Sequence, residues 1–309
     1  MLIIASEGYF CDMTSIEKKT PYPFKKIAVA VAFSPRIEAI LAESKRLQAI
    51  FKAQMIFIHV GERNIQQEEY LKHLLHRFEL DKPENKLLWE VGDPVDVILN
   101  KCQEYEVDLV VAGALEKETL VKYFLGSVAR KLSRRSKCSV LMLREPHIKS
   151  NSIKKIVVEG SDHPKTVNTI ETAVYIAKLV SAGDVTIVQE SDVSKMAVIR
   201  SDEFSDEEVV EHKEKINQED DRRLEAILRF ADCGSLKVNR ERIDGKPGYT
   251  ITQYARQYKA DLLVLNSPDT KLNLIDKVFP RDIEFALADL PCDLLIVHSQ
   301  TSELDEGIS

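Results

Sequence analysis

Short apolar runs alternate with amphipathic segments along most of the chain. In the first 145 residues, apolar runs of strand length lie at 26–32, 55–60, 87–91, 108–113 and 139–143. The segments between them carry apolar residues at helical spacing and predict helices at 35–52, 66–79, 94–105 and 121–135. Near-continuous apolar strands separated by helices indicate a parallel sheet covered by helices on both faces.

This pattern occurs twice. PFKKIAVAVAFSP (23–35) returns as SIKKIVVEGSDHP (152–164), VGDPVDVILNKCQEYEVDLVVAG (91–113) as DGKPGYTITQYARQYKADLLVLN (244–266), and CSVLMLR (138–144) as CDLLIVH (292–298). Three matches in the same order indicate a duplicated domain. We therefore predict an α/β protein of two tandem domains, each an open five-stranded parallel sheet with helices on both faces. Its parts are an N-terminal extension (1–24), a first domain (25–145), a second domain (152–299) and a tail (300–309).

The second copy is longer than the first between its first strand and its fourth. The surplus lies at about 190–230 and centres on the acidic stretch 200–227. Within it, EEVVEHKEKI predicts a helix with acid–base pairs four residues apart. A solvated helix or mobile flap is one interpretation of this segment, and an arm for dimerisation or partner docking is the other.

Composition narrows the classes of partner. The chain has 309 residues and a net charge of −7, so nucleic acid is not an expected partner, because phosphate binding needs clustered Lys and Arg. The basic cluster from Arg130 to Lys137 is interpreted as a solvated helix face. No apolar run reaches the ~20 residues of a membrane span, and the N-terminus shows no signal-peptide pattern. Five cysteines without a C-x-x-C pair fit reduced thiols. A cytoplasmic protein without membrane contact is expected.

The repeated segments resemble the universal stress protein family, in a tandem arrangement. Four stretches of the first copy carry this resemblance: KKIAVAVAFS, IFIHV, the segment 91–113 and GALEKETLVKYFLGSVARKLSRRSKCSVLML. It implies an adenine-nucleotide alpha-hydrolase-like, Rossmann-like fold. The family's nucleotide signature is G-x-x-G, nine residues, then G-[ST]. Gly113 matches the first glycine, Glu116 takes the place of the second, and Gly126 with Ser127 matches the final pair.

By this resemblance, ATP is the candidate cofactor of the first domain. Gly113, Gly126, Ser127 and the backbone near Val128 would hold phosphate, since helix N-termini and glycine loops present N–H groups to anions. Val60 would meet the base, and the turn at Ala32 and Phe33 would flank the sugar.

Two departures in the first copy weaken the expected site. Ala32 stands where ATP-binding members carry an aspartate, and Glu116 adds a negative charge near the phosphates. Charge repulsion of this kind costs on the order of 1–4 kcal/mol at a partly exposed site.

The second copy departs further from the signature. Asn266 and Asp269 replace the two loop glycines, and Phe279-Pro280 or Pro280-Arg281 replaces the Gly-Ser pair. The first strand of this copy is followed by four polar residues, Glu159, Ser161, Asp162 and His163. We interpret them as a loop with a helix cap, and binding of another ligand is the alternative. No ATP is expected in this copy.

Other candidate chemistry is weaker. His73 and His76 lie three residues apart on a predicted helix, but no nearby Cys or acid pattern completes a metal site. Ser34 and His59 suggest a nucleophile and base, yet no G-x-S-x-G elbow is present, and His59 is interpreted as packing or capping the strand end. Trp89 is expected in the core. We assign no catalytic residues and no metal, and expect no enzyme, although weak ATP hydrolysis stays open.

The apolar last strand of each copy, SVLML (139–143) and DLLIV (293–297), completes the sequence-based prediction. An exposed apolar edge strand is an aggregation hazard that proteins cover or pair, and universal stress proteins pair domains through this strand. The resemblance thus implies an internal pseudo-dimer of the two copies, and it allows a further homodimer. The expected function is regulation or interaction in a stress response, with at most a weak or conditional nucleotide site in the first domain. A functional ATP site in the loop 113–127 is the alternative.

Overall fold

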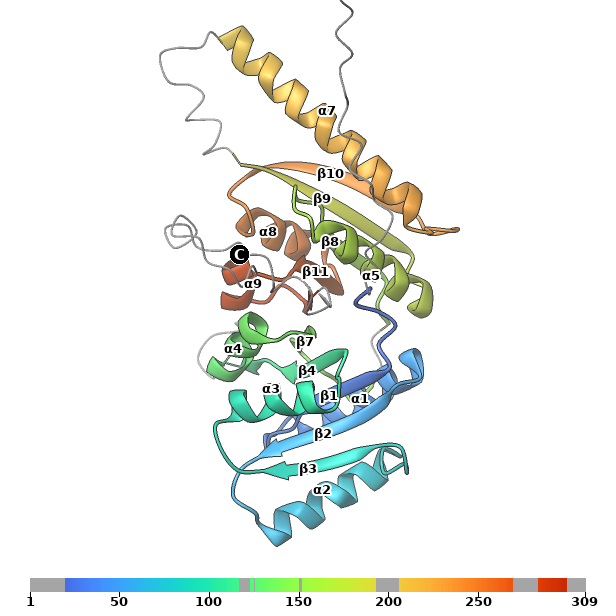
Figure 1. The fold of residues 1–309 in the computed structure, drawn as a ribbon, viewed down its shortest axis with the longest axis vertical. Coiled ribbons are helices and arrows are strands. Elements are labelled where there is room, and N and C mark those ends of the chain that lie inside the picture. Colours follow the sequence, from blue (N-terminus) through green and yellow to red (C-terminus); the bar gives the residue numbers. More distant parts are fainter. Residues whose placement is uncertain are drawn as a thin grey trace, which may run out of the picture.

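Ten strands form one continuous sheet that runs the length of the molecule (Figure 1). The computed structural model describes residues 20–116, 123–124, 126–149, 152–192, 206–268 and 283–298. The strand order is β10-β9-β8-β11-β12-β7-β4-β1-β2-β3, so the two halves of the chain contribute the two halves of the sheet.

The first half is a five-stranded parallel unit with the order β7-β4-β1-β2-β3. Its elements are β1 (Lys26–Ala30), α1 (Ile37–Phe51), β2 (Gln54–Val60), α2 (Ile65–Arg77), β3 (Lys86–Glu90), α3 (Pro94–Glu104), β4 (Leu109–Gly113), α4 (Ser127–Arg135) and β7 (Ser139–Leu143). A two-stranded hairpin of β5 (Leu115–Glu116) and β6 (Tyr123–Phe124) lies between β4 and α4.

The second half repeats this order as β10-β9-β8-β11-β12, and all its strands are parallel. Its elements are β8 (Lys155–Glu159), α5 (Thr166–Val180), β9 (Asp184–Asp192), α7 (Asp206–Phe230), β10 (Val238–Gly245), α8 (Tyr249–Tyr258), β11 (Leu262–Asn266), α9 (Ile283–Ala288) and β12 (Asp293–Val297). The predicted fold class is therefore confirmed.

The two units join at their last strands. β12 pairs antiparallel with β7, with Leu295 opposite Leu141. This contact covers the apolar edges of both strands, and the two domains consequently share one sheet. In the ten-stranded sheet, the two edges that stay open are those of β3 and β10, at opposite ends.

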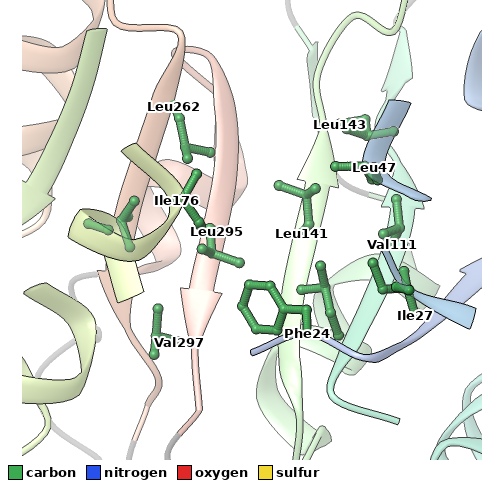
Figure 2. Packing of buried hydrophobic residues seen from close by; sticks show 14 of the residues in the cluster. Phe24, Ile27, Leu47, Val111, Leu141, Leu143, Ile176, Leu262, Leu295 and Val297 are labelled. Atoms are coloured by element: carbon green, nitrogen blue, oxygen red, sulfur yellow. The ribbon is translucent and has the colours of Figure 1, made fainter. Parts of the chain in front are cut away.

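Helices cover both faces of the sheet. α1, α2, α5 and α7 supply apolar residues to one buried cluster, and α3, α4, α8 and α9 supply them to the other. Figure 2 shows side chains of the first cluster at the junction, where Phe24 lies between strands of the two halves. Phe24 is fully buried.

The segment just before β1 also connects the two halves. The rings of Tyr22 and Tyr175 stack at 4.8 Å, and Phe24 makes edge contacts with Phe51 and Tyr175. Tyr175 belongs to α5 and Phe51 ends α1, so this aromatic group holds helices from both domains.

Capping residues explain where several helices begin. Asp93 precedes α3 and accepts hydrogen bonds from the backbone N–H groups of Val95 and Asp96, while Pro94 occupies the first turn. Asn64 caps α2 through the N–H of Gln67. The helix predicted at 121–135 instead begins at Ser127, because Tyr123 and Phe124 pair with β5 as a strand and Gly126 caps the helix.

The acidic surplus of the second copy contains a confirmed helix. α7 runs for 25 residues and connects β9 to β10, which is the place that the 13-residue α2 takes in the first domain. The difference, 25 minus 13, is 12 residues, or about 18 Å of helix. Leu224 and Ile227 anchor its C-terminal half in the core, and its N-terminal half projects past the sheet (Figure 1).

Candidate functional site

The predicted site residues of the first domain gather at one edge of the sheet. Parallel strands place their carboxyl ends at the same edge, which is where open α/β sheets bind ligands. Val60 ends β2 and Gly113 ends β4, while Ala32 and Phe33 follow β1. Ala32 is exposed and offers no charged or polar side chain at this position.

Three rings pack together at the ends of β1, β2 and β3. The ring of His59 lies 4.8 Å from that of Phe33 and 4.2 Å from that of Trp89, centroid to centroid. Phe33 also approaches Trp89 at 5.8 Å. Phe33 and Trp89 are both half-buried, so this group, here called the ring cluster, presents aromatic surface at the carboxyl end of β2 and β3.

Hydrogen bonds fix the ring cluster. Nδ1 of the buried His59 donates to the carbonyl oxygen of Val31 at 2.9 Å, and Nε1 of Trp89 donates to that of Gly61 at 3.1 Å. A Cβ at Gly61 would lie 3.0 Å from Nε2 of His59, so glycine lets the chain pass close to the imidazole. The prediction that His59 packs at the strand end is confirmed. Trp89, expected in the core, packs against the first core cluster as a half-buried residue at the edge of the site.

Gly113 sits against the first helix of the domain. A Cβ at this position would lie 2.9 Å from Cδ1 of Ile40, so any side chain here would fill the space between β4 and the start of α1. The glycine expected to meet phosphate is therefore at a close approach of backbone and helix.

The N-terminus of α4 has the features of an anion site. Gly126 caps the helix without a side-chain hydrogen bond, and no acidic residue lies in the first turn. Ser127 is exposed and Val128 is half-buried. Free backbone N–H groups at a helix start attract anions. Residues 117–122 and 125, and the side chain of Glu116, lie outside the described residues, so the position of that carboxylate stays a prediction.

The same position in the second domain holds a network of polar side chains. Asn266 ends β11 as Gly113 ends β4. Its Nδ2 donates to the hydroxyl oxygens of Ser161 and Thr166, both at 3.1 Å, and its Oδ1 accepts from the hydroxyl of Thr169. Thr166 in turn donates to the carbonyl of Ser161 at 2.7 Å.

Glu159 closes this polar network from the end of β8. Its Oε1 accepts from the hydroxyl of Ser161 at 2.6 Å, and its Oε2 accepts from the backbone N–H of Asn266 at 2.8 Å. We call Glu159, Ser161, Thr166, Thr169 and Asn266 the polar plug. The groups that would have to receive a ligand are already paired with each other.

The remaining candidates have structural partners. Nδ1 of the exposed His76 lies 2.7 Å from Oδ2 of Asp81, which holds the pKa of that carboxyl below its usual range through the hydrogen bond. Oγ of Ser34 accepts from the N–H of Arg36. Within the described ranges, no three His, Cys, Asp or Glu residues gather as a metal site. None of the described helices is long and apolar enough to cross a membrane.

The basic cluster on α4 makes specific contacts that its interpretation as a solvated face missed. Arg134 forms an ion pair with Glu284 of α9, with 2.6 Å between Nη2 and Oε1. Arg130 donates to the carbonyl of Leu287, and Arg135 pairs with Asp96 of α3. Two of these arginines therefore face the other domain.

Sequence reasoning also missed the two side-chain groups that characterise the sites. The ring cluster could have been found from its spacing, because His59 and Trp89 are each one residue from a strand end and lie opposite one another in the β2–β3 register. The polar plug joins residues about 100 positions apart, such as Ser161 and Asn266, and single-sequence patterns carry no signal for it.

Comparisons with known proteins identify the first domain. Residues 23–144 match the model of the universal stress protein family. The chain is 29% identical over 96 residues to universal stress protein Sll1388 of Synechocystis, and 42% identical over 53 residues to universal stress protein Rv1636 of Mycobacterium tuberculosis. It spans 62% of the length of the first relative and 36% of the second.

Solved structures extend the likeness to both halves. A functionally unknown protein, PA1789 of Pseudomonas aeruginosa PAO1, shares the fold with a TM-score of 0.67 at 16% identity, over 90% of this chain and 93% of that one. A universal stress protein from Archaeoglobus fulgidus matches 91% of this chain and 100% of its own, with a TM-score of 0.58 and 14% identity. The first domain, residues 23–144, is thus a universal stress protein domain, and both halves of the chain share the fold of these solved structures.

Proposed function

We propose that this protein is a regulatory or interaction protein of a stress response, in which only the first domain keeps a ligand site. The ligand would be an adenine nucleotide, bound weakly or conditionally. The asymmetry between Gly113 and Asn266 carries this proposal. Gly113 presents only backbone at its strand end, whereas the side chain of Asn266 is hydrogen-bonded to the hydroxyls of Ser161 and Thr166 at the matching position.

The described residues of the first domain favour binding over turnover. The ring cluster offers an aromatic surface on which a base could stack, and the start of α4 offers N–H groups to a phosphate. In the described part of this site, Nδ1 of His59 donates to the carbonyl of Val31, and Ala32 supplies no carboxylate to pair with the imidazole. An acid–base pair for hydrolysis is therefore not assembled from these residues.

Two features limit the proposed affinity. A nucleotide would lose the carboxylate contact that Ala32 cannot make, and the charge of Glu116 would oppose its phosphates by about 1–4 kcal/mol. Such a site would respond to conditions that offset the charge, such as a bound divalent cation. Full ATP binding through the loop 113–127 is the second candidate, favoured by Gly126 and the exposed Ser127 at the start of α4.

Calorimetry with ATP and Mg²⁺ separates these candidates. We expect weak binding by the wild type, at most one nucleotide per chain, and tighter binding by the variant that combines Ala32→Asp with Glu116→Gly. Micromolar binding by the wild type would favour the second candidate. If the double variant and the wild type both fail to bind, the first domain is not a nucleotide site.

A further inference from the structure

The sheet ends at β3 with an open row of backbone groups. The carbonyl of Glu90 accepts the N–H of Gly61 at 2.8 Å and so faces β2. Because successive residues of a strand direct their backbone groups to opposite sides, those of Leu87 and Trp89 face away from β2. Within the described chain, no strand pairs with this side of β3, which lies at the lower end of the sheet in Figure 1.

The two ends of the sheet differ in how they are protected. β10, at the other end, has the sequence VNRERIDG, and its Arg240 and Arg242 pair with Glu225 and Asp221 of α7. Charges of this kind discourage a second strand from pairing. β3 reads KLLWE, and its apolar centre Leu87–Trp89 is only half-buried, where the central strands of the sheet are almost fully buried.

The sequence of β3 is complementary to itself when it is reversed. In an antiparallel pair of two copies centred on Leu88, Leu88 faces Leu88, Leu87 faces Trp89, and Lys86 faces Glu90. Opposite charges directly across a pair stabilise it, as do apolar and aromatic pairs. Charge complementarity thus selects this register, because a parallel pair would set Lys86 against Lys86.

The backbone directions agree with the same register. Leu87 and Trp89, whose N–H and C=O groups point outward, become the hydrogen-bonded pairs, and each pair exchanges both bonds. Leu88 with Leu88, and Lys86 with Glu90, become the non-hydrogen-bonded pairs, in which side chains are closer. The charged side chains therefore meet where contact is shortest.

We propose that β3 pairs antiparallel with β3 of a second copy of this chain, around a two-fold axis at Leu88. The molecule already joins its own domains in this way, since β7 and β12 pair antiparallel edge to edge. A two-fold contact uses each β3 once and closes. The outer ends of the combined sheet are then the two charged β10 strands.

Exposed apolar residues next to β3 support an interface at this end. Val91, directly after the strand, is 68% exposed, and Ile65 at the start of α2 is 72% exposed. Exposed apolar side chains that gather at an open strand edge indicate a contact surface. Both residues lie near the carboxyl end of the sheet, Val91 two residues after Trp89 and Ile65 at the start of the helix that connects β2 to β3.

Sedimentation equilibrium of the full chain and its charge variants tests the proposal without any ligand. We expect a dimer whose dissociation constant rises at least tenfold in Lys86→Glu and in Glu90→Lys, because each variant sets like charges opposite one another twice. Glu90→Lys also breaks the ion pair of Glu90 with Lys101, so Lys86→Glu is the cleaner of the two variants. The variant with both changes restores opposite charges and should return to within about threefold of the wild type. Arg240→Glu on β10 is the matched control and should leave the constant unchanged.

Hydrogen exchange provides a second measurement that does not depend on the variants folding well. The amides of Leu87 and Trp89 should gain protection as the wild-type concentration rises, whereas the amide of Leu88, which faces β2, should be protected at every concentration. Three results would each overturn the proposal. The wild type could be a monomer at about 100 μM, all three charge variants could leave the dissociation constant of the dimer unchanged, or the amides of Leu87 and Trp89 could exchange at rates independent of concentration.

Discussion

The backbone N–H of Arg144 donates to Oδ1 of Asp293 at 2.8 Å, from the end of β7 to the start of β12. At the other end of the same strand pair, the N–H of His298 donates to Oγ of Ser139 at 3.3 Å. These two hydrogen bonds are related by the pseudo-two-fold symmetry of the domains. Each involves a residue whose side chain has a shifted pKa, through the carboxylate of Asp293 in the first and the backbone of His298 in the second.

Burial changes the pKa values of these two side chains in opposite senses. It raises the pKa of Asp293 to about 7. The nearby Glu43 adds to this increase, and Arg144 opposes it. It lowers the pKa of His298 to about 4, with Lys165 adding to the effect. Both groups are thus neutral in the folded protein near pH 5 to 6.

Their effects on stability should oppose each other. Between about pH 4 and 7, folded Asp293 holds a proton that the unfolded chain has released. The free energy of unfolding therefore falls by about 1.4 kcal/mol for each unit that the pH rises. Between about pH 4 and 6.5, the unfolded chain holds the proton of His298 that the folded protein lacks, so the free energy rises by about the same amount per pH unit.

Replacing Asp293 with Asn should expose the contribution of His298. Asn keeps an Oδ1 acceptor for Arg144 but does not titrate. Relative to wild type, the free energy of unfolding of Asp293→Asn should therefore grow by about 4 kcal/mol from pH 4 to 7. Urea denaturation at a series of pH values measures this difference, and a difference constant with pH contradicts the assignment. His298→Gln should show the opposite trend, losing stability relative to wild type as the pH rises to 6.5.

The polar plug should contribute to the free energy of unfolding and should have no effect on nucleotide binding. Asn266→Gly removes the amide that pairs with Ser161, Thr166 and Thr169, and should lower the free energy of unfolding by about 1–3 kcal/mol. No nucleotide site should appear, because Glu159 still presents its carboxylate there. Urea denaturation and calorimetry check the two parts, and nucleotide binding gained by this variant would contradict the restriction of the ligand site to the first domain.

Trp89 should report a ligand in the first domain. It is the single tryptophan of the chain, and it contacts His59 at the site. Titration with ATP and Mg²⁺ should change its fluorescence with the same midpoint as the binding heat. Gly113→Asn should abolish this change, since its side chain would enter the space beside Ile40. A fluorescence change that survives in Gly113→Asn would place the ligand elsewhere.

The two halves of α7 should respond differently to truncation of a side chain. Leu224 is 2% exposed and Ile216 is 41% exposed. Leu224→Ala should lower the free energy of unfolding by about 2–5 kcal/mol, and Ile216→Ala should change it by less than about 1 kcal/mol. Equal effects, measured by urea denaturation, would show that the N-terminal half of the helix also belongs to the core.

The strands and the duplication could be predicted from sequence because both halves repeat the same apolar pattern. Val29 and Val158, for example, occupy matching buried positions on β1 and β8. The sequence predicts a start of α4 six residues before the observed one, because the residues before Gly126 have helical apolar spacing and nothing in them signals the pairing of Tyr123 with Glu116. The residue at which α4 begins is decided by the pairing of β5 with β6, which helical spacing alone does not reveal.

The candidate site was predictable only as far as its backbone. Val60 and Gly113 end β2 and β4, which flank β1 in the parallel unit. The sequence could not show that Asn266 does more than replace a glycine, because the hydroxyls that hold it come from another strand end and another helix. Nor could it show that Phe33, His59 and Trp89 share one cluster, since that depends on the order of β1, β2 and β3 in the sheet.

The number of adenine nucleotides bound per chain tests the central claim most directly. Equilibrium dialysis with ATP and Mg²⁺, carried out on the Ala32→Asp/Glu116→Gly variant for sensitivity, should reach one nucleotide per chain. Adding Gly113→Asn should remove it, and adding Asn266→Gly should leave it unchanged. Two nucleotides per chain, or one that Gly113→Asn does not remove, would contradict the assignment of a single site to the first domain.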